Sequence, residues 1–418
     1  MKFPFVMCTF LLLVPDFLYA QHSATPATPL KVLLAEAEAQ NSQIASADSS
    51  WKASTYVARQ VTALPDPQFS VQTLSVGNPL PFAGFSDSDF AYIGFGASQD
   101  LPYPGKRKLK GDVANREAQT QKSNTDVVRS SVAEQVKMLY LRLSYSDAAL
   151  AILHQTDEVL QSVIKDALSR YSLGQGTQSS VIKAQLEHTK ILREETMHHG
   201  EVGQLQADLK QLLHRPQESP DIVVEPLSAT AFVRSQGELQ ESLRKQNPSI
   251  LMGSAAIAKQ DAQLAEIKSH SKPDFSIGYT FQLTGSNYRD YYMLTVGMRL
   301  PRRGRVAAET SEAAEMINRS RKDLDSDTQM KLADLQKQYV AVTSTSELID
   351  EYKNGLIPQS EAVLRSEQSA YQANKQEFSP VLTSLMDLLT MEHDYQEALF
   401  NHETALVRIE TLTGEALR

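Results

Sequence analysis

Residues 132–171 read VAEQVKMLYLRLSYSDAALAILHQTDEVLQSVIKDALSRY, and they end a stretch from Arg107 that contains no proline and one glycine, Gly111. Apolar side chains recur in it every 3.5 residues, which is the period of a coiled-coil helix and not of a strand. With a rise of about 1.5 Å per residue, the helix would be roughly 95 Å long. A helix of this length does not fit in one compact domain. The stretch therefore predicts a coiled coil, a tether or one of the long helices of a wall.

The same stretch occurs twice in the chain. Residues 162–171 match residues 362–371, ending in Tyr171 and Tyr371. Nearer the start of each copy, Asn41, Ile44 and Phe69 match Asn247, Ile250 and Phe275. The pattern indicates two copies of a unit of roughly 200 residues, a period too long for a solenoid.

Composition and the first residues suggest export. The chain has 418 residues and a formal net charge of −9, which gives no reason to expect nucleic-acid binding. Residues 1–20 have the basic start, apolar run and small-residue end of a signal peptide. Because Cys8, the one cysteine, lies in that segment, we expect no disulfide in the mature chain. No run of about 18 apolar residues follows. An exported chain of this kind is periplasmic, secreted or an outer-membrane β-barrel.

The order of elements is the same in both copies. The first repeat, 21–215, is expected to hold a helix at 32–61, strands at 67–76 and 90–100, a long helix at 107–171 and a return helix at 180–213. Ser179 or Ser180 is the expected N-cap of that return helix. A proline-containing linker, 216–238, precedes the second repeat, 239–418. We expect its elements to be a helix at 239–269, strands at 274–284 and 291–300, a long helix at 306–371 and a return helix at 380–413.

The four strands have the pattern of membrane strands. Residues 275–283 and 292–300 alternate apolar or aromatic with small or polar side chains. Each strand is about ten residues long, which suits a tilted transmembrane strand. A half-buried soluble hairpin is the alternative, but the signal peptide favours the membrane. Open edges are not tolerated in lipid, so several chains must share one barrel. Two chains would give a barrel filled by side chains, and three would give twelve strands and room for a pore.

The tip motif Tyr171-Ser-Leu-Gly-Gln-Gly-Thr-Gln-Ser-Ser-Val, its counterpart at 371–382 and the turn Leu101-Pro-Tyr-Pro-Gly-Lys resemble the TolC-type outer-membrane efflux proteins. The resemblance covers almost the whole mature chain, and the turn is similar to that of the heavy-metal efflux branch. It implies a homotrimer in which a twelve-stranded β-barrel in the outer membrane of a Gram-negative bacterium continues into a periplasmic α-helical barrel. It also implies two partners, a periplasmic adaptor (membrane fusion) protein and an inner-membrane pump of the RND type.

The sequence departs from this family in three places. Many members carry Asp-Val-Leu-Asp at the second tip, where this chain has Pro380-Val-Leu-Thr383. The pattern therefore does not support a gate made of that aspartate ring. The tip glycine of the family is Asn374 here, and the N-terminal cysteine that anchors many relatives to lipid is absent.

The candidate adaptor-docking residues lie at the two helix–turn–helix tips. They are Gly174, Gly176, Ser179 and Val181 at the first tip, and Asn374, Ser379 and Val381 at the second. Turn chemistry alone accounts for the glycines, but the tips are also where a partner hairpin could pack as a coiled coil. Glu377 and Asp387 are the acidic residues nearest the second tip. They either line the aperture or lie on a solvated helix face.

Two further sets of residues have a structural and a functional interpretation. Lys106, Arg107, Arg302 and Arg303 follow the second and fourth strands, either as a soluble basic turn or as anchors to lipid phosphates of the inner leaflet. Gly355 and Pro358 interrupt the second long helix, where proline removes a backbone hydrogen bond. We expect a kink or local unwinding there, which is either a hinge or a static bend.

No catalytic motif, cofactor motif or metal-binding spacing stands out. The histidines at 188, 198, 199, 393 and 402 show no specific spacing with cysteine or carboxylates. The leading hypothesis is a passive export duct for metal ions or small toxic compounds. The alternative is a periplasmic coiled-coil scaffold without a pore, which would have no use for lipid-facing aromatic residues.

Overall fold

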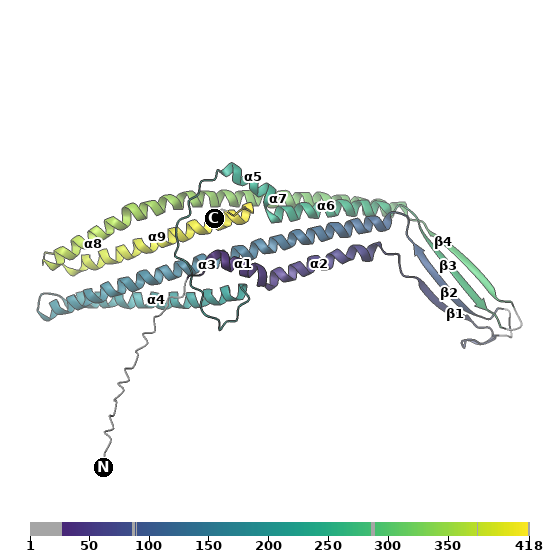
Figure 1. Cartoon of the computed structure of the whole chain (residues 1–418), viewed down its shortest axis with the longest axis horizontal. Helices are drawn as coiled ribbons and strands as arrows, with labels where there is room; N and C mark the ends of the chain where they lie inside the picture. Colours follow the sequence, from purple (N-terminus) through teal and green to yellow (C-terminus); the bar gives the residue numbers. More distant parts are fainter. Residues whose placement is uncertain (1–26, 86–87, 89, 286–288, 374, 417–418) are drawn as a thin grey trace, which may run out of the picture.

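The computed structural model describes residues 27–85, 88, 90–285, 289–373 and 375–416; the expected signal peptide and Asn374 lie outside them. The elements are α1 (Leu30–Gln40), α2 (Ser42–Thr62), β1 (Gln68–Leu74), β2 (Tyr92–Leu101), α3 (Lys106–Ser172), α4 (Gln178–Leu212), α5 (Gln236–Gln246), α6 (Pro248–Ser269), β3 (Asp274–Leu283), β4 (Tyr291–Arg299), α7 (Arg303–Glu351), a π-helical turn (Tyr352–Leu356), α8 (Ile357–Gln372) and α9 (Phe378–Thr413). The sheet lies at one end of an elongated molecule, and the α3–α4 and α8–α9 turns lie at the other (Figure 1).

Helix α3 runs without interruption for 67 residues and extends along most of the helical part (Figure 1). The heptad positions Val132, Val136, Leu143 and Leu160 are buried on its inner face. The shorter helices α2 and α4 both pack against α3, one after the other along its length (Figure 1). No helix in the described part of the chain combines the length and the hydropathy needed to cross a membrane.

The helix expected at 32–61 is two helices, and the break lies at Asn41. The Asn41 side chain accepts hydrogen bonds from the backbone N–H groups of Gln43 and Ile44, which makes it the N-cap of α2. In the second repeat Asn247 caps α6 by accepting from Ile250 N–H, so the helix expected at 239–269 is also divided. The matching asparagines therefore mark a helix break in both repeats.

Unlike α3, the second long helix is interrupted. The N–H of Ile357 donates to the carbonyl of Tyr352, five residues back, and the π-helical turn separates α7 from α8. The physical cause is Pro358, which has no N–H to donate and whose ring crowds the carbonyl of Asn354. A wider turn moves that carbonyl away from the ring. The distortion expected from the sequence is present, and its motion stays a prediction.

The sheet joins the two repeats. Its order is β1-β2-β3-β4, and every neighbouring pair is antiparallel. Phe281 is paired with Phe95 on one side and with Tyr292 on the other, so apolar residues of neighbouring strands share one face. The opposite face carries mainly glycine and polar residues, among them Gly96, Thr280 and Gly297. A Cβ atom at Gly96 would lie 2.6 Å from Ser70 Oγ, so close side-chain approach requires the glycine.

Candidate functional site

The two tips are closed by the same backbone contact. At the first, the N–H of Gln175 donates to the carbonyl of Arg170 at 2.9 Å, and at the second Lys375 donates to Ala370 at the same distance. Gly174 has a φ of 72°, the left-handed conformation that favours glycine. Thr177 is the N-cap of α4 and accepts from Ser180 N–H, which corrects the expectation of Ser179 or Ser180.

The predicted docking residues fall into an exposed and a buried group. Gly174, Gly176 and Ser179 are exposed, and Ser379 is half-buried. Val181 and Val381 are only 6% and 2% exposed, so their side chains are not available to a partner. The first tip instead exposes apolar side chains that are not among the predicted docking residues. They are Leu168, Tyr171, Leu173, Ile182 and Leu186.

Val181 and Val381 hold the two hairpins together. They belong to one apolar cluster with Leu364 and Phe378, which links α3 and α4 to α8 and α9. Near the tips, the guanidinium carbon of Arg170 lies 4.2 Å from the centre of the Tyr371 ring, a cation–π contact between the repeats. The two tips of one chain therefore form a single packed unit.

Glu377 and Asp387 are both exposed. Glu377 directly precedes α9, and its side chain makes no capping hydrogen bond there. Whether either carboxylate lines an aperture depends on neighbouring protomers, so that role stays a prediction.

The four candidate basic anchors differ from one another. Lys106 is 7% exposed, and its Nζ lies 2.8 Å from both Asp274 Oδ1 and the Lys272 carbonyl. It joins the start of α3 to the start of β3 and is not available to a lipid phosphate, which corrects the expectation for this residue. Arg107 donates to the Thr62 carbonyl at 3.1 Å. Arg302 and Arg303 are exposed and keep their candidate role.

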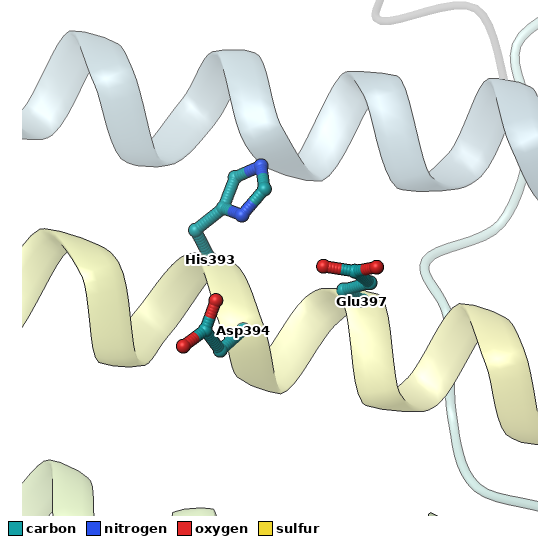
Figure 2. Close-up of side chains that lie close together, drawn as sticks. All are labelled: His393, Asp394 and Glu397. Atoms are coloured by element: carbon teal, nitrogen blue, oxygen red, sulfur yellow. The ribbon is translucent and has the colours of Figure 1, made fainter.

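The structure brings out a group that contains His393, for which the sequence alone indicated no metal-binding spacing. His393, Asp394 and Glu397 on α9 each offer one possible metal-ligand atom, and these atoms lie within 4.8 Å of one another. The His393 ring reaches from α9 toward α3 (Figure 2). There its Nε2 lies 2.9 Å from the hydroxyl of Tyr145. The available signal was the spacing of four between His393 and Glu397, which places both on one face of a helix.

Comparison with known proteins identifies the class. Residues 33–214 match the model of the family described as outer membrane efflux protein. Curated protein sequences give no match. The structure resembles Vibrio cholerae VceC, with 15% identity, a TM-score of 0.76 and coverage of 93% of this chain and 97% of that one. It also resembles CusC, with 15% identity, a TM-score of 0.77 and coverage of 93% and 92%. It resembles Campylobacter jejuni CmeC as well, with 11% identity, a TM-score of 0.78 and coverage of 92% of this chain and 85% of that one.

The match of residues 33–214 to the outer membrane efflux protein family agrees with the resemblance seen in the sequence. The fold of the matched structures extends over both repeats and confirms the predicted architecture, with four strands in each chain. The family comprises passive outer-membrane channels with a large periplasmic helical part, so the expectations of efflux, outer-membrane location and no enzymatic activity are confirmed. The scaffold alternative finds no support.

Proposed function

We propose that this chain is one protomer of a trimeric export duct in a tripartite efflux system. The duct passively receives metal ions or small toxic compounds from an inner-membrane pump of the RND type through a periplasmic adaptor. The pump supplies the energy and selects most of the substrate. The duct supplies the path through the periplasm and the outer membrane.

The sheet is the observation that carries this proposal. Strands β1 and β4 each have one unpaired edge in the single chain. Unpaired backbone groups are costly in lipid, so other chains must cover both edges. Phe69 on β1 and Leu294 on β4 are 81% and 67% exposed on the apolar face, which suits contact with lipid. Three chains would close a twelve-stranded barrel wide enough for a pore.

The first tip supports an adaptor as the partner. Leu173 is 68% exposed and Ile182 55% exposed at the end of the molecule farthest from the sheet (Figure 1). Apolar side chains on a helical hairpin suit coiled-coil packing with another hairpin. Gly174, Gly176 and Ser179 lie between them, and Asn374 and Ser379 complete the proposed tip surface. Glu377 and Asp387 are the proposed lining of the aperture, and Arg302 and Arg303 the proposed contacts to the lipid of the inner leaflet.

The mass of the detergent-extracted protein tests the assembly. We expect outer-membrane fractions to yield an oligomer of three chains in light scattering. A monomer that keeps its full helical content would contradict the proposal, because the two edges would then be stable alone. A deletion strain exposed to a panel of metals and antibiotics tests the substrate, and increased sensitivity to one class identifies it.

A substitution at the tip tests the partner. Leu173→Asp places a charge on the proposed docking surface and should abolish complementation of the deletion strain while the trimer still forms. The same change at Val233, which is 91% exposed in the linker, serves as the control and should complement. Full complementation by Leu173→Asp would show that this part of the tip does not dock the adaptor.

A further inference from the structure

The residues His393, Asp394 and Glu397 have the composition of a metal site. Imidazole nitrogen and carboxylate oxygen are the side-chain ligands that Zn²⁺ and related divalent ions bind in proteins, whereas Ca²⁺ and Mg²⁺ prefer oxygen alone. His393 and Glu397 are one helical turn apart on α9, and Asp394 lies beside them (Figure 2). We propose that these three side chains bind a divalent transition-metal ion, Zn²⁺ being the best match.

Tyr145 on α3 gives the imidazole the support that metal-bound histidines have. Its hydroxyl lies 2.9 Å from His393 Nε2, so Nε2–H can donate to it and leave Nδ1 for the ion. Such a contact to the second nitrogen fixes the ring and its tautomer.

The charges around the group favour a cation. Among the described residues, neither Asp394 nor Glu397 forms an ion pair with a lysine, an arginine or a histidine. Arg142 is a cation next to Tyr145, and its guanidinium lies 5.1 Å from the Tyr145 ring. The Arg142 guanidinium is already paired with the carboxylate of Glu201 on α4, and its Nε donates to Glu201 Oε1 at 2.6 Å. The two carboxylates of α9 are therefore free to neutralise a divalent ion.

The first repeat shows that packing alone does not require this group. With α4 and α9 aligned as their matching starts indicate, Arg193 takes the place of His393 and Met197 that of Glu397. Arg193 pairs with its neighbour Glu194 at 3.0 Å, an ordinary surface contact. The ligand set is thus particular to the second repeat, and it does not depend on which substrate the duct exports.

The site would hold its ion reversibly. Three protein ligands leave at least one position of a tetrahedral Zn²⁺ open to water. Asp394 Oδ2 also accepts from the Tyr352 hydroxyl at a long 3.4 Å. The ion and that hydroxyl compete for the same carboxylate, so removal of the Tyr352 hydroxyl should not weaken ion binding.

Titration of the purified full-length oligomer in detergent tests the site. Zn²⁺ is followed by calorimetry, and Co²⁺ by the visible absorption of its tetrahedral complex. We expect one ion for each chain, and His393→Ala and Glu397→Gln should each weaken the affinity about tenfold or more. His188→Ala is the control, because His188 also faces a carboxylate, Asp157 Oδ1 at 3.0 Å, and should not change the affinity.

Two tyrosine variants separate the site from loss of structure. Tyr145→Phe removes the support of His393 and should weaken Zn²⁺ binding, whereas Tyr352→Phe should not. Each variant is compared at equal helical content and oligomer mass. Equal Zn²⁺ affinity and stoichiometry in the parent and in His393→Ala would overturn the proposal, as would a parent oligomer that binds no Zn²⁺.

Discussion

The side-chain amide of Asn41 donates a hydrogen bond to the backbone carbonyl of Leu212, with 2.9 Å between the atoms. Asn247 makes the same contact with Leu412 at 3.0 Å. The carbonyls in the last turn of a helix lack partners within it, so both amides satisfy groups that would otherwise be unpaired. Each repeat thus ties the break in its first helical segment to the end of its own return helix.

Asn41→Ala should destabilise the protein. It removes the N-cap of α2 and leaves the Leu212 carbonyl without its partner, for a combined cost of roughly 2 kcal/mol. Thermal unfolding of the oligomer followed by circular dichroism measures the loss, and Asn247→Ala should behave in the same way. Ser49→Ala is the control, because the Ser49 hydroxyl bonds only within its own helix, to the Ala45 carbonyl. An Asn41→Ala variant as stable as the control would contradict the role of the contact.

Glu392 should make stability depend on pH. Burial raises its pKa above the usual value of 4.5, and the nearby Glu361 raises it further. A raised pKa in the folded state means that Glu392 contributes stability below its unfolded pKa and that this contribution is lost as the pH rises through its folded pKa. Glu392→Gln should therefore be more stable than the parent at pH 7, with the difference vanishing in acid. Unfolding at a series of pH values measures this, and a constant difference between the two proteins would be the contrary result.

The two faces of the sheet should respond differently to a charge. Phe281 lies on the apolar face, where its ring centre is 5.3 Å from that of Tyr292. A basic residue facing lipid near the bilayer midplane costs about 2–4 kcal/mol, and an acidic one somewhat less. Phe281→Asp or Leu294→Asp should therefore reduce the amount of assembled oligomer in outer membranes. Thr280→Asp, on the opposite face, should leave that amount unchanged. Equal loss from both faces would show that the apolar face does not meet lipid.

Local patterns predicted most of the fold, because they repeat over many residues. The period of 3.5 in α3 and the alternation in β3 and β4 gave the correct element types, and the break before Pro358 followed from the chemistry of proline. Asn41 matches Asn247 in the sequence, but a single capping residue does not outweigh the helical pattern around it. The divided helices were therefore missed.

The candidate sites were harder to predict because they depend on contacts between distant segments. The tip motif predicts Val181 on the docking surface, yet the side chain packs against the second hairpin. The position of Lys106 after a strand predicts a contact with lipid, yet its side chain pairs with Asp274. His393 becomes a candidate metal ligand because its ring contacts the hydroxyl of Tyr145, which is 248 residues away in the chain. Sequence spacing alone carries no information about such pairs.

Pro358→Ala should make the second long helix straight and stiff. Alanine restores the missing N–H, so the π-helical turn at Tyr352–Leu356 can become α-helical. Relief of the interior proline stabilises the helix by up to about 3 kcal/mol. If this turn is the hinge on which the α8–α9 hairpin swings, the straightened helix should favour the closed duct and reduce conductance in planar bilayers and export in cells.

Glu158→Ala is the matched control for the hinge, since Glu158 has the corresponding place in the uninterrupted α3. It should conduct and export as the parent does. The Pro358→Ala structure has to confirm that the turn is lost, because a retained π turn would leave the hinge in place. A straightened variant that opens and exports as well as the parent would show that Gly355 and Pro358 form a fixed bend, which fits the helix to its neighbours without moving.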